Sequence, residues 1–172
     1  MEKKKKILIV RCVFGVLSLA LMALIFWFSS QTKEESGAAS DGVAAVLRDF
    51  LRLFLSEETA EMLLGYVRQC AHFFLYACLG LCVSIFVFTF PCGHGWAFWV
   101  IPLLICLMYA CSDEIHQLFV AGRSGKLSDV GIDALGFTLT TAAANLVRLF
   151  ASRRKKRRER EGLRQVDVAK RL

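Results

Sequence analysis

Two carboxylates, an imidazole and an amide stand within five residues of the sequence, in the stretch YACSDEIHQLF at residues 109–119. Glu114 and His116 are suited to general acid/base chemistry, because a carboxylate and an imidazole can both take up and release a proton. On a helix, four polar side chains of this stretch fall within an arc of roughly 160°, namely Asp113, Glu114, His116 and Gln117. The stretch therefore predicts one polar helix face at the end of an apolar run.

Three other segments place ionisable groups at the same level. Arg68 and His72 are four residues apart, as are Asp129 and Asp133, so each pair shares one face of a helix. The loop VAGRSGKLSD between the last two apolar runs carries Arg123. Ionisable groups inside a membrane are costly and normally face the interior of a bundle, so this pattern predicts a polar pocket.

Three interpretations of this pocket are open. In the first, Glu114 performs acid/base chemistry with His116 or His72, while Arg68 and Arg123 clamp a phosphate or pyrophosphate. In the second, the charges form a structural network of salt bridges that locks the helices together. The third is a metal site built from His72, Glu114, His116 and Asp129. No zinc-type motif is present, so we predict neither a metal ion nor a cofactor.

The elements that must position these groups are apolar. The chain has 172 residues, of which 56% are hydrophobic, and its mean hydropathy is +0.50. A hydrocarbon core of about 30 Å requires roughly 20 apolar residues per helix. The third apolar run, at 96–111, is shorter than this, so its helix must include the polar turn. The sequence predicts an all-α membrane protein with four transmembrane helices, at about 7–28, 71–90, 96–118 and 129–150.

Basic clusters stand at both ends of the chain, as MEKKKK and RRKKRRER. The segment 30–70 instead holds four Lys/Arg against seven Asp/Glu, so the positive-inside rule places both termini in the cytoplasm. We therefore expect three parts of the chain: a basic cytoplasmic N-terminus at 1–6, one four-helix membrane domain at 7–150, and a basic cytoplasmic tail at 151–172. Because the tail adjoins a span and has no interleaved aromatic residues, we expect it to bind anionic lipid rather than nucleic acid.

The acidic segment between the first two spans has its own pattern. Apolar residues recur at helical spacing over 43–54, which predicts an amphipathic helix lying in the membrane interface. A second helix is expected to begin after Ser56, a suitable N-cap, and to continue into span two. The fourth span carries small residues at Gly136, Thr140 and Ala144, and this spacing favours close helix contact at the centre of the bundle.

Two further features of the chain have simple interpretations. The first apolar run is too long for the hydrophobic region of a signal peptide, so we expect it to remain as a span. The chain has seven cysteines, and Cys70 and Cys111 both fall near the same ends of their helices. The odd total and the lack of a spacing pattern argue against a disulfide framework.

The polar motifs together resemble the VanZ-like family. The motifs are SSQ at the end of span one, RQCAHFFLYACLG from Arg68, and SDEIHQLFVAGRSGKLSDVGIDALG from Ser112. The resemblance implies a multi-pass protein of the bacterial plasma membrane, with a role in the cell envelope and in teicoplanin-type antibiotic resistance. It also implies that eight residues stand at signature positions: Gln31, Arg68, His72, Glu114, Gln117, Arg123, Asp129 and Asp133.

Residues and resemblance together predict an outward-facing polar pocket that acts on, or binds, an envelope lipid or lipid-linked precursor. The candidate catalytic residues are Glu114, His116 and His72. The candidate substrate-binding residues are Gln31, Arg68, Gln117, Arg123, Asp129 and Asp133. A non-enzymatic scaffold or partner-binding protein, with a structural polar cluster, is the alternative.

Overall fold

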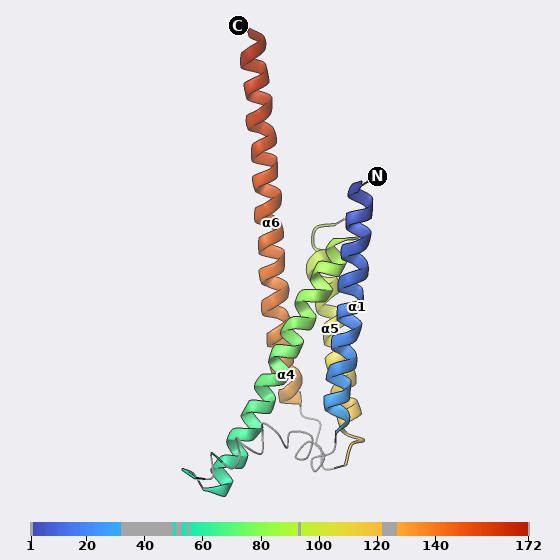
Figure 1. Cartoon of the computed structure of the whole chain (residues 1–172), viewed down its shortest axis with the longest axis vertical. Helices are drawn as coiled ribbons and strands as arrows, with labels where there is room; N and C mark the ends of the chain where they lie inside the picture. Colours follow the sequence, from blue (N-terminus) through green and yellow to red (C-terminus); the bar gives the residue numbers. More distant parts are fainter. Residues whose placement is uncertain are drawn as a thin grey trace.

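The computed structural model describes residues 2–31, 50, 53–54, 56–92, 94–121 and 127–171, without the side chains of 60–65, 67–68 and 166–171. Its helices are α1 (Glu2–Ser30), α4 (Glu57–Phe88), α5 (Ala97–Gln117) and α6 (Leu127–Arg171) (Figure 1). Each of the four contains a segment long and apolar enough to cross a membrane. The prediction of an all-α fold with four transmembrane helices is therefore confirmed.

Local sequence explains where α4 begins and where α5 ends. The Ser56 hydroxyl accepts a hydrogen bond from the Thr59 amide at 3.4 Å, and Glu57 and Glu58 occupy the positive first turn of α4. From this cap α4 continues without a break to Phe88, as the sequence predicts. Helix α5 ends only at Gln117, so the polar turn belongs to the helix, also as predicted.

Two predictions about segments are left without a structural test. Of the expected interfacial helix at 43–54, only residues 50, 53 and 54 lie among the described residues. The domain boundaries at residues 6 and 150 also stay predictions, and α6 itself is one continuous helix on both sides of residue 150.

Helices α4 and α5 each pack against all three of the others. Helix α1 packs against α4 and α5, and α6 packs against the same two helices. In Figure 1, α1 and α5 run side by side while α4 crosses obliquely towards α6. The expectation that the fourth span lies at the centre of the bundle stays a prediction, while Gly136 of α6 gives an especially short approach to α4.

The contact between α4 and α6 depends on two glycines. A Cβ atom added at Gly80 would lie 2.7 Å from the Phe137 Cα, and one added at Gly136 would lie 2.6 Å from the Phe73 carbonyl oxygen. No side chain fits at either distance, so each glycine lets one backbone touch the other helix. Phe137 itself is buried in the core, beside Tyr76 and Leu79 of α4.

Apolar side chains cover much of the surface of the bundle. On α1 the exposed ones include Leu8, Ile9, Val16, Leu19 and Trp27. Such a surface is unfavourable in water, whereas lipid tails are as apolar as these side chains. The outer surface is therefore suited to contact with the hydrocarbon core of a membrane.

We call the end of the bundle that carries Arg11, Thr89 and Arg148 the basic end. The Arg11 guanidinium donates to the Thr89 carbonyl oxygen at 2.7 Å and to its hydroxyl at 3.1 Å, which joins α1 to the end of α4. Arg148 of α6 lies 3.5 Å above the centroid of the Phe98 ring in α5, a cation–π contact. Arg148 also lies 5.3 Å from the centroid of the Phe88 ring in α4, so these contacts connect all four helices at one end.

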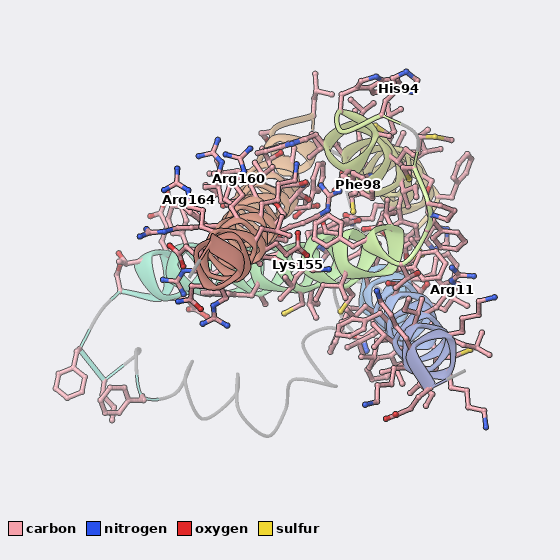
Figure 2. The ribbon with its side chains drawn as sticks, turned by 90° about the horizontal axis from the view of Figure 1, so that it is seen from above. Arg11, His94, Phe98, Lys155, Arg160 and Arg164 are labelled. Atoms are coloured by element: carbon pink, nitrogen blue, oxygen red, sulfur yellow. The ribbon has the colours of Figure 1, made fainter. Side chains whose placement is uncertain are left out.

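Beyond the basic end, α6 continues alone. Residues 151–165 are all exposed, and the helix runs on to Arg171. Figure 2 looks along this helix and shows Arg160 and Arg164 projecting outward from it. At 1.5 Å per residue, the segment after residue 150 extends about 30 Å past the apolar part of the bundle.

We predict that Gly136→Ala destabilises the protein by about 1–3 kcal/mol, because the new methyl group forces α6 away from the backbone of α4. Gly131→Ala is the matched control on the same helix, since a Cβ atom there meets nothing within 4 Å. That control should be neutral or slightly stabilising, as alanine favours helix. Thermal unfolding of the purified proteins in detergent measures both, and equal melting temperatures would contradict the proposed close contact.

Candidate functional site

The polar turn of α5 is buried at the end of the bundle opposite the basic end. We call this end the acidic end and define it by Asp113, Glu114 and Asp133. The exposed fractions of these side chains are 3%, 7% and 2%, while Ile115 on the other face of α5 is 57% exposed. The predicted division of this turn into one polar inner face and one apolar outer face is therefore present in the fold.

A hydrogen-bonded network joins α1 to α5 at the acidic end. The Ser29 hydroxyl donates to Asp113 Oδ2 at 2.8 Å. The Gln117 amide Nε2 donates to the Ser29 oxygen at 3.2 Å and to the same Asp113 oxygen at 3.3 Å. Because all three side chains are at least 95% buried, each bond replaces water that the group has lost on folding.

Tyr76 of α4 and Asp133 of α6 complete the buried cluster. Tyr76 is fully buried, and its electrostatic neighbours include Asp113, Asp133 and Glu114. The neighbours of Asp133 are Glu114, Asp113 and Asp129. Side chains from α4, α5 and α6 thus meet at one place, to which α1 adds Ser29 through its bond to Asp113.

His116 faces α1 rather than this cluster. Its ring stacks on Phe26 with centroids 4.4 Å apart, and its Nε2 lies 3.1 Å from the Ser30 hydroxyl. That hydroxyl already donates its single proton to the Phe26 carbonyl oxygen at 2.7 Å. Ser30 and Phe26 of α1 therefore hold the His116 ring on the α1 side of α5.

The carboxylate of Asp129 lies at the edge of the acidic end. It is half-buried and accepts a hydrogen bond from the Gln69 amide of α4 at 3.2 Å and another from the adjacent Ser128 hydroxyl at 3.2 Å. Asp129 therefore helps to join the start of α6 to α4, one helical turn away from the buried Asp133.

The predicted site residues fall into three groups. Glu114, Gln117 and Asp133 are buried at the acidic end. Four others are half-buried around it: Gln31, His72, His116 and Asp129. The ring of His72 lies 6.5 Å from that of Tyr76, which is one turn further along the same helix. His72 therefore stands beside the buried cluster. The Arg68 side chain and Arg123 lie outside the described part of the chain.

Three residues of the cluster were absent from the predicted site: Ser29, Tyr76 and Asp113. Asp113 precedes Gln117 by one helical turn, and Tyr76 follows His72 by one turn, so helical spacing carried a signal for both. Ser29 belongs to the SSQ motif at the end of span one, but helical spacing gave no partner for it. Its role depends on the pairing of α1 with α5, which spacing within one segment does not specify.

Buried carboxylates are the costly part of this arrangement. A charge removed from water needs donors or cations to compensate it, and Asp113 Oδ2 has two donors. Among the described residues, no group of three or more His, Cys, Asp and Glu side chains is arranged to hold a metal ion. Cys70 and Cys111 are both free thiols on exposed positions. The polar contacts of the cluster are therefore hydrogen bonds and charge interactions between helices.

These features define a small multi-pass membrane protein whose helices meet at a buried acidic cluster. The model of the VanZ/LLP1 family matches residues 14–148, which is more than half of the chain. The chain therefore belongs to the VanZ/LLP1 family, and the family resemblance of its motifs is confirmed. No curated protein matches the chain, and no solved structure does either.

We predict that Ser29→Ala lowers the free energy of unfolding by about 1–3 kcal/mol, because it leaves a buried carboxylate oxygen without its shortest hydrogen bond. Ser112→Ala removes a hydroxyl from an exposed position of α5, where it bonds only to the Tyr109 carbonyl of its own helix, and is the matched control. Melting temperatures in detergent compare the two variants. Equal small effects would mean that the network contributes little to the pairing of α1 with α5.

Proposed function

We propose that this VanZ-like membrane protein acts on, or binds, an envelope lipid or lipid-linked precursor in the outer leaflet of a bacterial plasma membrane. Through this activity it contributes to resistance against glycopeptides of the teicoplanin type. The observation that carries the proposal is the burial of Asp113, Glu114 and Asp133 among three helices at one end of the bundle. Ionisable groups at such positions mark functional sites in membrane proteins.

The depth of the cluster suits a lipid headgroup. Asp113 lies four residues from the end of α5, and Asp133 lies six residues from the start of α6. These separations correspond to about 6 and 9 Å along the helices. Groups at this depth are close to the headgroup region of a bilayer whose hydrocarbon core the four helices cross.

The chemistry of the site follows from its acid and imidazole groups. We propose Glu114 as general acid or base, with His72 as its partner. Two observations support His72 over His116: the His72 ring is near Tyr76, whereas His116 is committed to Phe26 and Ser30 of α1. His116 then has a positioning role. The proposed binding residues are those predicted from the sequence: Gln31, Arg68, Gln117, Arg123, Asp129 and Asp133.

We predict that Glu114→Gln removes resistance while the amount of membrane-inserted protein and its melting temperature stay nearly unchanged. Glutamine keeps the shape of the side chain but cannot exchange a proton. The teicoplanin concentration that inhibits a host expressing the variant should fall to that of a host with an empty vector. Glu58→Gln, an exposed acid in the first turn of α4, is the control and should keep wild-type resistance. Full resistance in Glu114→Gln would exclude acid/base chemistry by this residue.

The second candidate function is a non-enzymatic scaffold. The Ser29, Asp113 and Gln117 network favours it, because all of its bonds are made within the protein and join two helices. In that case, the loss of resistance in any variant of the acidic end follows the loss of folded protein. The melting temperatures measured with the resistance assay separate the two functions.

The proposed orientation places the basic end in the cytoplasm and the acidic end at the outer surface. Its support is the distribution of charge, including the exposed basic extension of α6 after residue 150. Anionic lipids of the inner leaflet would bind the part of this extension nearest the bilayer, since the attraction falls off within about 10 Å.

We predict that green fluorescent protein fused after Leu172 is fluorescent and that alkaline phosphatase fused there is inactive, as both require a cytoplasmic C-terminus. The same reporters inserted after Gln31, at the end of α1, should give the opposite result. An active phosphatase at Leu172 would contradict the proposed orientation and would mean that the acidic end faces the cytoplasm.

A further inference from the structure

Tyr76 is the buried group that the acid/base proposal does not use. Its side chain is fully buried, and its hydroxyl has no hydrogen-bond partner among the described residues. Its electrostatic neighbours show that it points towards the acidic cluster, since they include Asp113 and Asp133. A buried hydroxyl without a partner is unfavourable, so its retention at this place calls for a reason.

A carboxylate oxygen of Asp113 is also buried without a hydrogen-bond partner among the described residues. Asp113 Oδ2 accepts from Ser29 and Gln117, while Oδ1 is buried and has no hydrogen-bond partner in the described part of the chain. Asp133, which is 2% exposed, stands within electrostatic range of Asp113 and Tyr76 from a third helix. In the described part of the chain, oxygens on α4, α5 and α6 thus share one electrostatic neighbourhood, and two of them have no hydrogen-bond partner there.

A ligand with N–H donors and a positive charge would satisfy these oxygens. The lysines and arginines with described side chains all lie at residues 3–11 or from Arg148 onward, towards the basic end. A metal ion needs several ligands at about 2.0–2.6 Å, and the described residues hold no such group. A protonated primary amine carries three N–H donors that reach acceptors at about 2.7–3.2 Å, so it tolerates acceptors that are farther apart.

We propose that Tyr76, Asp113 and Asp133 form a binding site for a protonated primary amine. The inference rests on the proposed function, because it names the headgroup chemistry that the same end of the bundle recognises. The two carboxylates supply charge and acceptors, and the tyrosine oxygen accepts the third N–H. The amine belongs either to a lipid headgroup such as that of phosphatidylethanolamine or to a water-soluble molecule.

The experiment compares ligands that differ only in their N–H groups. The full-length wild-type protein is released from vesicles containing phosphatidylethanolamine, phosphatidylcholine and phosphatidylglycerol, and native mass spectrometry counts the lipids that stay bound. Phosphatidylcholine has the same charge and phosphate but a trimethylated nitrogen without donors. We expect phosphatidylethanolamine to be retained at least about tenfold over phosphatidylcholine, which corresponds to about 1.4 kcal/mol.

Variants locate the site. Tyr76→Phe and Asp133→Asn should each reduce this preference to near unity. Tyr66→Phe and Glu58→Gln change a tyrosine and an acidic residue at exposed positions of α4. Both control variants should keep the preference for phosphatidylethanolamine. An unchanged preference in folded Tyr76→Phe and Asp133→Asn would overturn the assignment to these residues. The comparison of lipids on the wild-type protein tests the amine even where a variant fails to fold.

A second arm distinguishes the two sources of the amine. Ethanolamine and choline are added to the wild-type protein in detergent, and the melting temperature is measured. A rise with ethanolamine but not choline, without any lipid preference, supports a water-soluble amine. Equal retention of the two lipids together with equal effects of the two soluble compounds would overturn the proposal. Loss of resistance in Glu114→Gln alongside that result would leave the proposed function standing while this inference fails.

Discussion

The burial of carboxylates at one end of a thin helical bundle is the constraint on which this structure depends. Asp113 and Asp133 are almost fully buried, and a single helix cannot bury its own side chains, so both depend on packing between helices. Burial of a charge is tolerated only with donors, cations or a shared proton nearby. The Ser29 hydroxyl and the Gln117 amide meet part of this need, and they do so by fixing how α1 and α5 pair.

Close packing of α4 on α6 determines what else enters the cluster. The glycines at 80 and 136 let the two backbones approach so closely that neither position can hold even a methyl group. This approach brings Tyr76 and Asp133 together, because each stands one turn from the contact along its own helix. The basic end is held by different forces, in which guanidinium groups lie over the rings of Phe90 and Phe98. Packing and polar chemistry are therefore separated along the length of the bundle.

The polar groups at the two ends of this VanZ/LLP1 protein differ in how fully they are hydrogen-bonded. At the basic end, every described polar contact of Arg11 is made to protein, which suits an anchor. At the acidic end, a buried tyrosine hydroxyl and a buried carboxylate oxygen lack partners among the described residues. The proposed amine ligand would satisfy these groups, and it would account for polar atoms that internal bonds of the described residues leave unmatched.

Sequence alone determined the number and nature of the helices, the Ser56 cap of α4, and the polar inner face of α5, because each follows from apolar length or helical spacing within one segment. It also identified Glu114, Gln117 and Asp133 as inward-facing. Only the tertiary structure decided that α4 and α5 each contact all three other helices, that His116 turns to α1, and that Ser29 and Tyr76 join the cluster. These outcomes depend on how neighbouring helices pair and how closely they approach, and periodicity along a single helix carries no information about its partner.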